Sequence, residues 1–133
     1  MKKSNIELRI YYPLNSICIY IYFFLLFSSC AYYNTFYNAE KSFEKASIII
    51  EESPLLDQGE IPPQAKKFLS QSIENSEIVL QEYPNSKYLD DAFYIISKAR
   101  FLRSEYALAI KNLDQLINEF PNSEYITEAM IWK

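Results

Sequence analysis

Apolar side chains recur at three- and four-residue steps through most of the chain after its first thirty residues. This spacing places them on one face of an amphipathic helix, with polar side chains on the opposite face. The pattern predicts five consecutive helices, which cover residues 31–52, Gln64–Tyr83, Lys87–Arg103, Glu105–Glu119 and a last segment that begins near Glu124.

The segments between the predicted helices carry residues that interrupt helical structure. Ser53 precedes Pro54, and a proline disfavours helical geometry in the residue before it. The loop over residues 54–63 contains three of the six prolines and the only glycine. Ser86 and Ser104 lie just before predicted helices and are candidates for helix N-caps. Because the later connections are short, consecutive helices are expected to run antiparallel.

A second pattern is a repeat. The sequence Tyr-Pro-Asn-Ser at residues 83–86 returns as Phe-Pro-Asn-Ser at residues 120–123, so Pro84 and Pro121 are 37 residues apart. Positions after the turn also correspond: Tyr88 with Tyr125, Ala92 with Ala129, and Phe93 with Met130. Self-similarity at a period of about 20–50 residues is typical of solenoid proteins, which present binding surfaces more often than they perform chemistry.

Residues 92–121 resemble the tetratricopeptide repeat, to which they align without gaps. The resemblance implies that a small residue, Ala109, stands where two helices cross closely and that bulky residues interlock around it. The positions that match the family are Phe93, Ile96, Tyr106, Ala109, Leu113, Leu116 and Pro121. The resemblance implies an all-α fold of tetratricopeptide-like antiparallel helical hairpins, stacked as a short right-handed solenoid.

The chain departs from the family pattern at five positions, which are Ser72, Ser76, Ser97, Arg100 and Ser104. Two of these serines replace favoured glycines and the arginine replaces a favoured aromatic residue. A generic helical bundle without repeats is therefore an alternative. The last predicted helix would lack its partner and expose an apolar face, so we expect the chain to be a fragment of a longer repeat protein.

The first thirty residues have the pattern of an export signal. Residues 1–9 are basic, residues 17–27 are an unbroken run of eleven apolar or aromatic side chains, and a Ser-Ser-Cys sequence ends at residue 30. A basic start, an apolar stretch and a small-residue exit are typical of a signal peptide. The sequence therefore predicts a signal peptide at residues 1–29 and a helical-repeat domain at residues 30–133.

The sequence Leu-Phe-Ser-Ser-Cys at residues 26–30 resembles the lipobox of bacterial lipoproteins, except that Phe27 stands where an aliphatic residue is expected. In that family the cysteine is lipidated, which makes Cys30 the predicted lipidation site. The resemblance also implies sorting to the outer membrane, because Ala31 rather than aspartate follows. Two alternatives are that Cys30 is an ordinary buried thiol and that Ile17–Tyr33 stays uncleaved as a signal anchor.

Composition argues against several kinds of chemistry. The chain has no His, one Gly and two Cys, and Cys18 would leave with the signal peptide. Metal centres, phosphate-binding glycine loops and disulfides are therefore disfavoured, and we expect no cofactor, no metal, no small-molecule substrate and no enzymatic activity. Residues 30–133 carry 10 Lys or Arg against 16 Asp or Glu, and this net charge of −6 argues against nucleic acid as a partner.

Three groups of side chains are candidate sites. An aromatic stripe is expected to lie mainly in the core and consists of Tyr33, Phe36, Tyr37 and Phe43. Two acidic pairs, Glu51-Glu52 and Asp90-Asp91, diverge by about 100° on a helix and do not form a catalytic couple. The tetratricopeptide resemblance implies an inner groove with four partner-binding residues, Asp91, Tyr94, Lys98 and Phe101. Phe101 is equally compatible with packing on the helices that follow.

The Cys-led start and the repeated turn together resemble outer-membrane tetratricopeptide lipoproteins of the BamD (YfiO) type. That resemblance implies a lipoprotein that faces the periplasm and binds protein partners of the cell envelope as a scaffold. Outer-membrane protein assembly is the specific role it implies. The alternative is an envelope adaptor in cell division or cell-wall maintenance.

Overall fold

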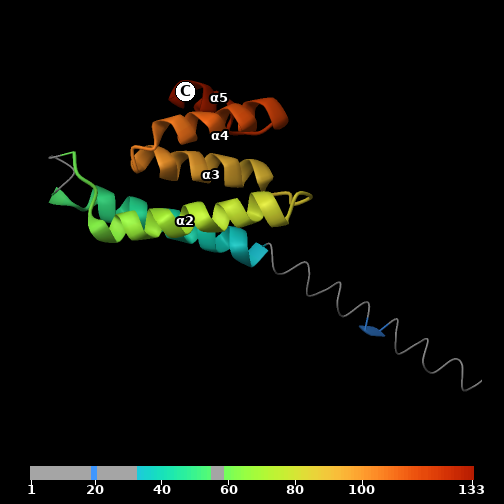
Figure 1. Ribbon diagram of the computed structural model, residues 1–133, viewed down its shortest axis with the longest axis horizontal. Coiled ribbons are helices and arrows are strands. Elements are labelled where there is room, and N and C mark those ends of the chain that lie inside the picture. Colours follow the sequence, from blue (N-terminus) through green and yellow to red (C-terminus); the bar gives the residue numbers. More distant parts are fainter. Residues whose placement is uncertain (1–18, 21–32, 55–58) are drawn as a thin grey trace, which may run out of the picture. The chain divides into compact units, whose positions relative to one another are not determined.

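A computed structural model describes the chain over residues 19–20, 33–54 and 59–133 (Figure 1). The chain divides into two compact units, residues 1–33 and 34–133. The predicted signal peptide, the lipobox and Cys30 lie outside the described residues, apart from residues 19–20, which are helical. Every regular element within the described ranges is a helix, which confirms the all-α class for that part of the chain.

The helices of the larger unit follow one another in the order that the sequence predicts. A helix over residues 33–51 precedes α2 (Pro63–Glu82), α3 (Leu89–Leu102), α4 (Tyr106–Glu119) and α5 (Ile126–Trp132). α3 packs against both α2 and α4, and α5 packs against α4. The chain reverses direction between each of these helices and the next, so neighbouring helices from α2 to α5 are antiparallel (Figure 1).

Three apolar clusters hold these helices together. In the first, Ile50 meets Leu69 of α2 and Ile96 of α3, and in the third, Phe93 meets Leu116 of α4. Leu80 of α2 packs against all three clusters. Each fully buried leucine or isoleucine stabilises the fold by about 1.5–3 kcal/mol relative to an exposed one. Since the described region contains no disulfide partner, apolar burial is the main source of its stability.

The two copies of the repeated turn have the same backbone geometry. Tyr83 has φ −126° and ψ 60°, and Phe120 has φ −127° and ψ 59°. In each turn the amide of the serine donates to the carbonyl oxygen of the aromatic residue three positions earlier, at 2.9 Å in Ser86 and in Ser123. The repeated sequence therefore produces a repeated structure, because the same proline and polar residues impose the same exit from a helix.

The hydroxyl groups of the serines in these turns bond to residues that precede the next helix, and not to the helix itself. The hydroxyl oxygen of Ser86 accepts a hydrogen bond from the amide of Tyr88 at 3.1 Å, and α3 begins only at Leu89. Ser123 does the same for Tyr125 at 3.3 Å. The prediction that Ser86 is the N-cap of α3 is therefore wrong. Ser86 lies three residues before the start of α3, and its hydroxyl closes a local turn with Tyr88 instead, which is a common use of serine.

Ser104 was also expected to cap a helix, and this prediction is wrong too. α4 begins at Tyr106 with Glu105 as its N-cap residue. Ser104 has φ 62°, the left-handed geometry that favours glycine. The amide of Glu105 donates to the carbonyl oxygen of Arg100 at 2.9 Å, which closes the end of α3 around this residue. The sharp corner between α3 and α4 therefore depends on a strained serine.

Ser72 lies at the close crossing of α2 and the helix over residues 33–51. Its side chain is completely buried, and its hydroxyl donates to the carbonyl oxygen of Ala39 at 2.8 Å. Ser76, one turn later, is equally buried. A small side chain lets two helix axes approach. Ser72 therefore supplies the small side chain that this close crossing needs.

Candidate interaction surface

Asp91, Tyr94, Lys98 and Phe101 lie at steps of three and four residues along α3, so they share one face of that helix. The opposite face is apolar, and its Phe93 and Ile96 are buried in the core. This division of α3 leaves the four candidate residues partly exposed. The structure therefore brings together all four residues that the sequence singled out, and it also gives each of them partners within the chain.

The beginning of this face is joined to α5 through tyrosines. The rings of Tyr94 and Tyr125 stack with their centroids 4.2 Å apart and their planes at 11°. The hydroxyl of Tyr125 donates to a carboxylate oxygen of Asp91 at 2.7 Å. Asp91 is thus half-buried and engaged, because Tyr125, the residue just before α5, donates a hydrogen bond to it.

The ammonium group of Lys98 lies among three aromatic rings from three different helices. Its distances to the ring centroids are 4.9 Å for Tyr94, 5.4 Å for Trp132 and 5.9 Å for Phe43. It also lies 3.4 Å from the carboxylate of Glu128 and donates to the hydroxyl of Tyr94 at 3.1 Å. Each ring attracts a cation through its negative face. Lys98 consequently connects α3 with the helix over residues 33–51 and with α5.

Phe101 closes the face at its far end. Its ring meets Tyr106 of α4 edge-on at 5.2 Å and Trp132 of α5 edge-on at 4.8 Å. The residue still exposes 39% of its surface. Phe101 therefore packs on α4 and α5 and is also exposed to solvent, because two edge contacts cover only part of its ring.

Burial and nearby charges shift the pKa values of Asp91 and Tyr125. Burial raises the pKa of Asp91, and the carboxylates of Asp90 and Glu124 add to the rise, while the hydrogen bond from Tyr125 opposes it. Burial, with the adjacent Asp91 carboxylate, raises the pKa of Tyr125 well above its ordinary value of 10.0. At neutral pH the phenol therefore keeps its proton and donates it to the carboxylate.

Lys98 and Glu128 form a partly exposed ion pair, with 3.4 Å between the ammonium nitrogen and a carboxylate oxygen. Burial lowers the pKa of Lys98, but its contacts with Tyr94 and Glu128 raise that pKa by more, so the net shift is upward. The contact with Tyr94, together with the charge of Lys98, lowers the pKa of Glu128. Both groups are therefore charged over the whole physiological range. This keeps a fixed cation and a fixed anion side by side on the surface.

Three further residues complete the surface and were not among the sequence candidates: Tyr125, which immediately precedes α5, and Glu128 and Trp132 of α5. The repeat contained a signal for one of them, because Glu128 stands 37 residues after Asp91 and occupies the same position in its helix. Trp132 gave no such signal, since its counterpart at that offset is Ile95, a buried residue.

The aromatic stripe of the first helix is divided between core and surface. Phe36 is buried and stacks on Tyr88, with centroids 4.5 Å apart and planes at 4°. Phe43 is half-buried near Lys98, whereas Tyr33 and Tyr37 are exposed. The expectation of a mainly buried stripe is therefore wrong for the two tyrosines, which lie on the solvent side of the helix.

Arg100 replaces the aromatic residue that the tetratricopeptide pattern favours at its position. Its guanidinium donates to the carboxylate of Glu77 on α2 and to the amide oxygen of Asn112 on α4. The arginine thus spans three helices from the side of α3 that faces away from Lys98. In this position it holds neighbouring helices in register through charge-assisted hydrogen bonds.

The described ranges, residues 19–20, 33–54 and 59–133, hold neither a metal-binding cluster nor a membrane-spanning helix. In these ranges no three His, Cys, Asp or Glu side chains gather closely enough to hold a metal ion. Within the same part of the chain, no helix combines the length and the apolar character needed to cross a bilayer. The acidic pair Glu51-Glu52 is exposed, and Asp90-Asp91 lies in the first turn of α3, where acids favour the helix dipole.

A comparison of the chain with protein-family models finds no match, and comparisons with the curated proteins and with the solved structures find none either.

Proposed function

We propose that this protein is a membrane-anchored lipoprotein that acts as a protein–protein interaction scaffold, built of tetratricopeptide-like hairpins stacked as a short right-handed solenoid. The observation that carries the proposal is the equivalence of the two turns, which agree in sequence, backbone angles and hydrogen bonds. The tyrosine after each turn also stacks on an earlier helix, Tyr88 on Phe36 and Tyr125 on Tyr94. Repeated packing of this kind is what a solenoid requires.

The face of α3 is the proposed partner-binding surface. It combines a fixed ion pair, Lys98 with Glu128, and partly exposed aromatic rings, Phe101 among them. Aromatic side chains supply large contact areas at low entropy cost, and charged groups select the partner. Because contacts within the chain already hold these side chains, little ordering remains to oppose binding.

Lipidation at Cys30 is the proposed anchor, with the repeat domain facing the periplasm from the outer membrane. A tether of this kind raises the effective concentration of the domain for partners in the same membrane. The proposed partners are proteins of the cell envelope that take part in outer-membrane protein assembly. No step of this function needs a cofactor, a metal or a catalytic residue.

The partner surface is tested with a double variant, Lys98→Glu with Phe101→Ala, and a matched control on α4, Lys111→Glu with Leu108→Ala. Both control residues are exposed. Full-length protein carrying each change is purified from cross-linked cells and the captured envelope proteins are identified. We expect barrel-assembly components with the wild type and the control, and their loss with the double variant. Capture of cell-division or wall proteins instead would reject the specific role.

The anchor is tested separately with Cys30→Ser. We expect wild-type protein to fractionate with outer membranes and to carry acyl chains detectable by mass spectrometry. The serine variant should lose both, because a hydroxyl cannot form the thioether to the lipid. Unchanged fractionation without an acyl mass in the wild type would refute the lipid anchor, without bearing on the α3 surface.

A further inference from the structure

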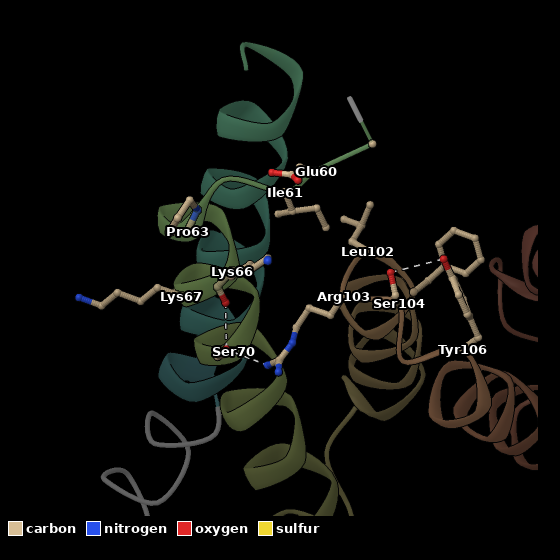
Figure 2. Close-up of a pocket in the computed structure, with 12 residues that line it drawn as sticks. Glu60, Ile61, Pro63, Lys66, Lys67, Ser70, Leu102, Arg103, Ser104 and Tyr106 are labelled. Atoms are coloured by element: carbon tan, nitrogen blue, oxygen red, sulfur yellow. Dashed lines mark hydrogen bonds between the residues drawn. The ribbon is translucent and has the colours of Figure 1, made fainter. Parts of the chain in front are cut away.

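A groove with a volume of about 940 Å³ lies between the beginning of α2 and the corner that joins α3 to α4. Figure 2 shows its two walls, with Lys66 and Ser70 on α2 and with Tyr106 beyond the corner. Arg103 reaches from the corner towards α2, where its guanidinium donates to the hydroxyl of Ser70 at 2.7 Å. The floor of the groove therefore includes a hydrogen bond between two residues that lie 33 positions apart in the sequence.

The charge of this groove is opposite to that of the chain. Among the described residues that line it, Lys66, Lys67 and Arg103 are positive and Glu60 is negative, while the whole chain has a net charge of −4. The side chain of Lys67 extends away from the corner (Figure 2), so Lys66 and Arg103 are the cations that face the groove. Lys66 forms no ion pair with any acid among the described residues. Arg103 pairs with Glu105 at 2.9 Å, which leaves other donors of its guanidinium available.

Two exposed aromatic rings line the same groove. Phe101 and Tyr106 expose 39% and 52% of their surfaces and meet edge-on at 5.2 Å. The left-handed backbone of Ser104 sets the corner that presents both rings. A ligand that fits this groove therefore needs negative groups for the cations and apolar groups for the rings.

We propose that this groove docks an acidic, partly apolar peptide segment of a partner protein, in extended form. Carboxylates of the segment pair with Lys66 and Arg103, and an apolar side chain rests on Phe101 and Tyr106. In an extended peptide, successive side chains point to opposite sides, so its acidic side chains can face the cations while its apolar side chains face the rings. A lipid surface is disfavoured, because lipid-binding patches carry about 4–8 clustered cations. The acidic balance of the chain disfavours nucleic acid.

The test uses a fluorescein-labelled peptide of alternating Glu and Leu, a matched peptide of alternating Gln and Leu, and the full chain in detergent. Fluorescence anisotropy is measured at low and high salt. We expect the Glu peptide to bind, the Gln peptide to bind at least about tenfold more weakly, and added salt to weaken the Glu peptide alone.

Three variants locate the binding. Lys66→Glu should weaken the Glu peptide by about tenfold or more, because it replaces an attraction with a repulsion, and Arg103→Gln should weaken it by about tenfold. Lys111→Glu, an exposed charge change outside the groove, should leave it unchanged. Circular dichroism checks that each variant is folded.

Equal binding of both peptides, or an unchanged affinity in Lys66→Glu, would overturn the proposal. So would Lys66-dependent binding to phosphatidylglycerol vesicles in the absence of peptide binding, since it would assign the groove to lipid. The groove extends beyond the α3 surface and is tested apart from it, because Lys98→Glu should not affect the peptide.

Discussion

At the scale of single residues, function-bearing and structural side chains are hard to separate in this protein. Lys98 is a candidate for partner binding, yet it already lies among three rings and beside Glu128. Ser104 looks like a helix cap in sequence, yet its contribution is a left-handed backbone. In both cases the neighbours of the residue in space, and not its type, determine what it does.

Replacement of Ser104 by glycine should stabilise the protein. A left-handed conformation costs a non-glycine residue about 1–2 kcal/mol, and part of the gain is lost to the greater freedom of glycine in the unfolded chain. We expect the free energy of unfolding of Ser104→Gly to rise by roughly 0.5–1 kcal/mol, measured by urea denaturation. Ser104→Ala is the control, because it keeps the strain. Equal effects of the two changes would contradict this account.

Asp91 should make the stability depend on pH. Because its pKa is raised in the folded state, the folded protein holds this proton more tightly than the unfolded chain does. Its contribution to the free energy of unfolding is therefore greatest below the ordinary pKa of 3.8 and is lost as the pH rises through the raised value. Asp91→Asn keeps an acceptor for Tyr125 and removes the charge.

The free energy of unfolding of Asp91→Asn should consequently increase relative to the wild type as the pH rises from about 3 to 7. Urea denaturation at several pH values measures this difference. Tyr125→Phe serves as a second variant, since it removes the opposing hydrogen bond and should enlarge the pH dependence of Asp91. A constant difference between Asp91→Asn and the wild type would show that the carboxylate titrates as in the unfolded chain.

At the scale of elements, the helices depend on how closely they approach one another. The sequence predicts each helix to within a few residues, because amphipathic spacing and proline positions act locally. The resemblance to the tetratricopeptide repeat puts Ser72 at a packing position, but the sequence does not reveal its partner, because Ala39 lies 33 residues earlier.

Enlargement of Ser72 should disrupt the pairing of α2 with the first helix. Ser72→Leu would insert a bulky group at a fully buried crossing, and overpacking of this kind costs about 1–3 kcal/mol. Ser72→Ala should cost less, about 0.5–1.5 kcal/mol, because it removes only the hydrogen bond to Ala39. Thermal unfolding followed by circular dichroism measures both. A tolerated leucine would show that the helices can move apart without loss.

At the scale of the whole described region, three clusters act as one core. Leu80 packs against all of them and so connects α2 with helices on both sides. A core that shares residues in this way favours cooperative unfolding, in contrast to a row of independent hairpins.

Leu80→Ala should therefore destabilise every helix, and not α2 alone. We expect a loss of about 2 kcal/mol, at the lower end for leucine truncation because Leu80 is only partly buried. Ile78→Ala, an exposed position on the same helix, is the matched control and should cost much less. Hydrogen exchange measures protection helix by helix. Loss of protection confined to α2 would contradict a shared core.

The sequence alone determined the helical class, the order of the helices and the two equivalent turns, since periodicity, prolines and turn residues act over a few positions. It also placed Asp91, Tyr94, Lys98 and Phe101 on one face by spacing. Only the tertiary structure decided that α5 covers part of that face, that Ser72 marks a helix crossing, and that Lys66 and Arg103 meet across one groove. These features join residues about thirty or more positions apart, and such contacts arise only when helices pack.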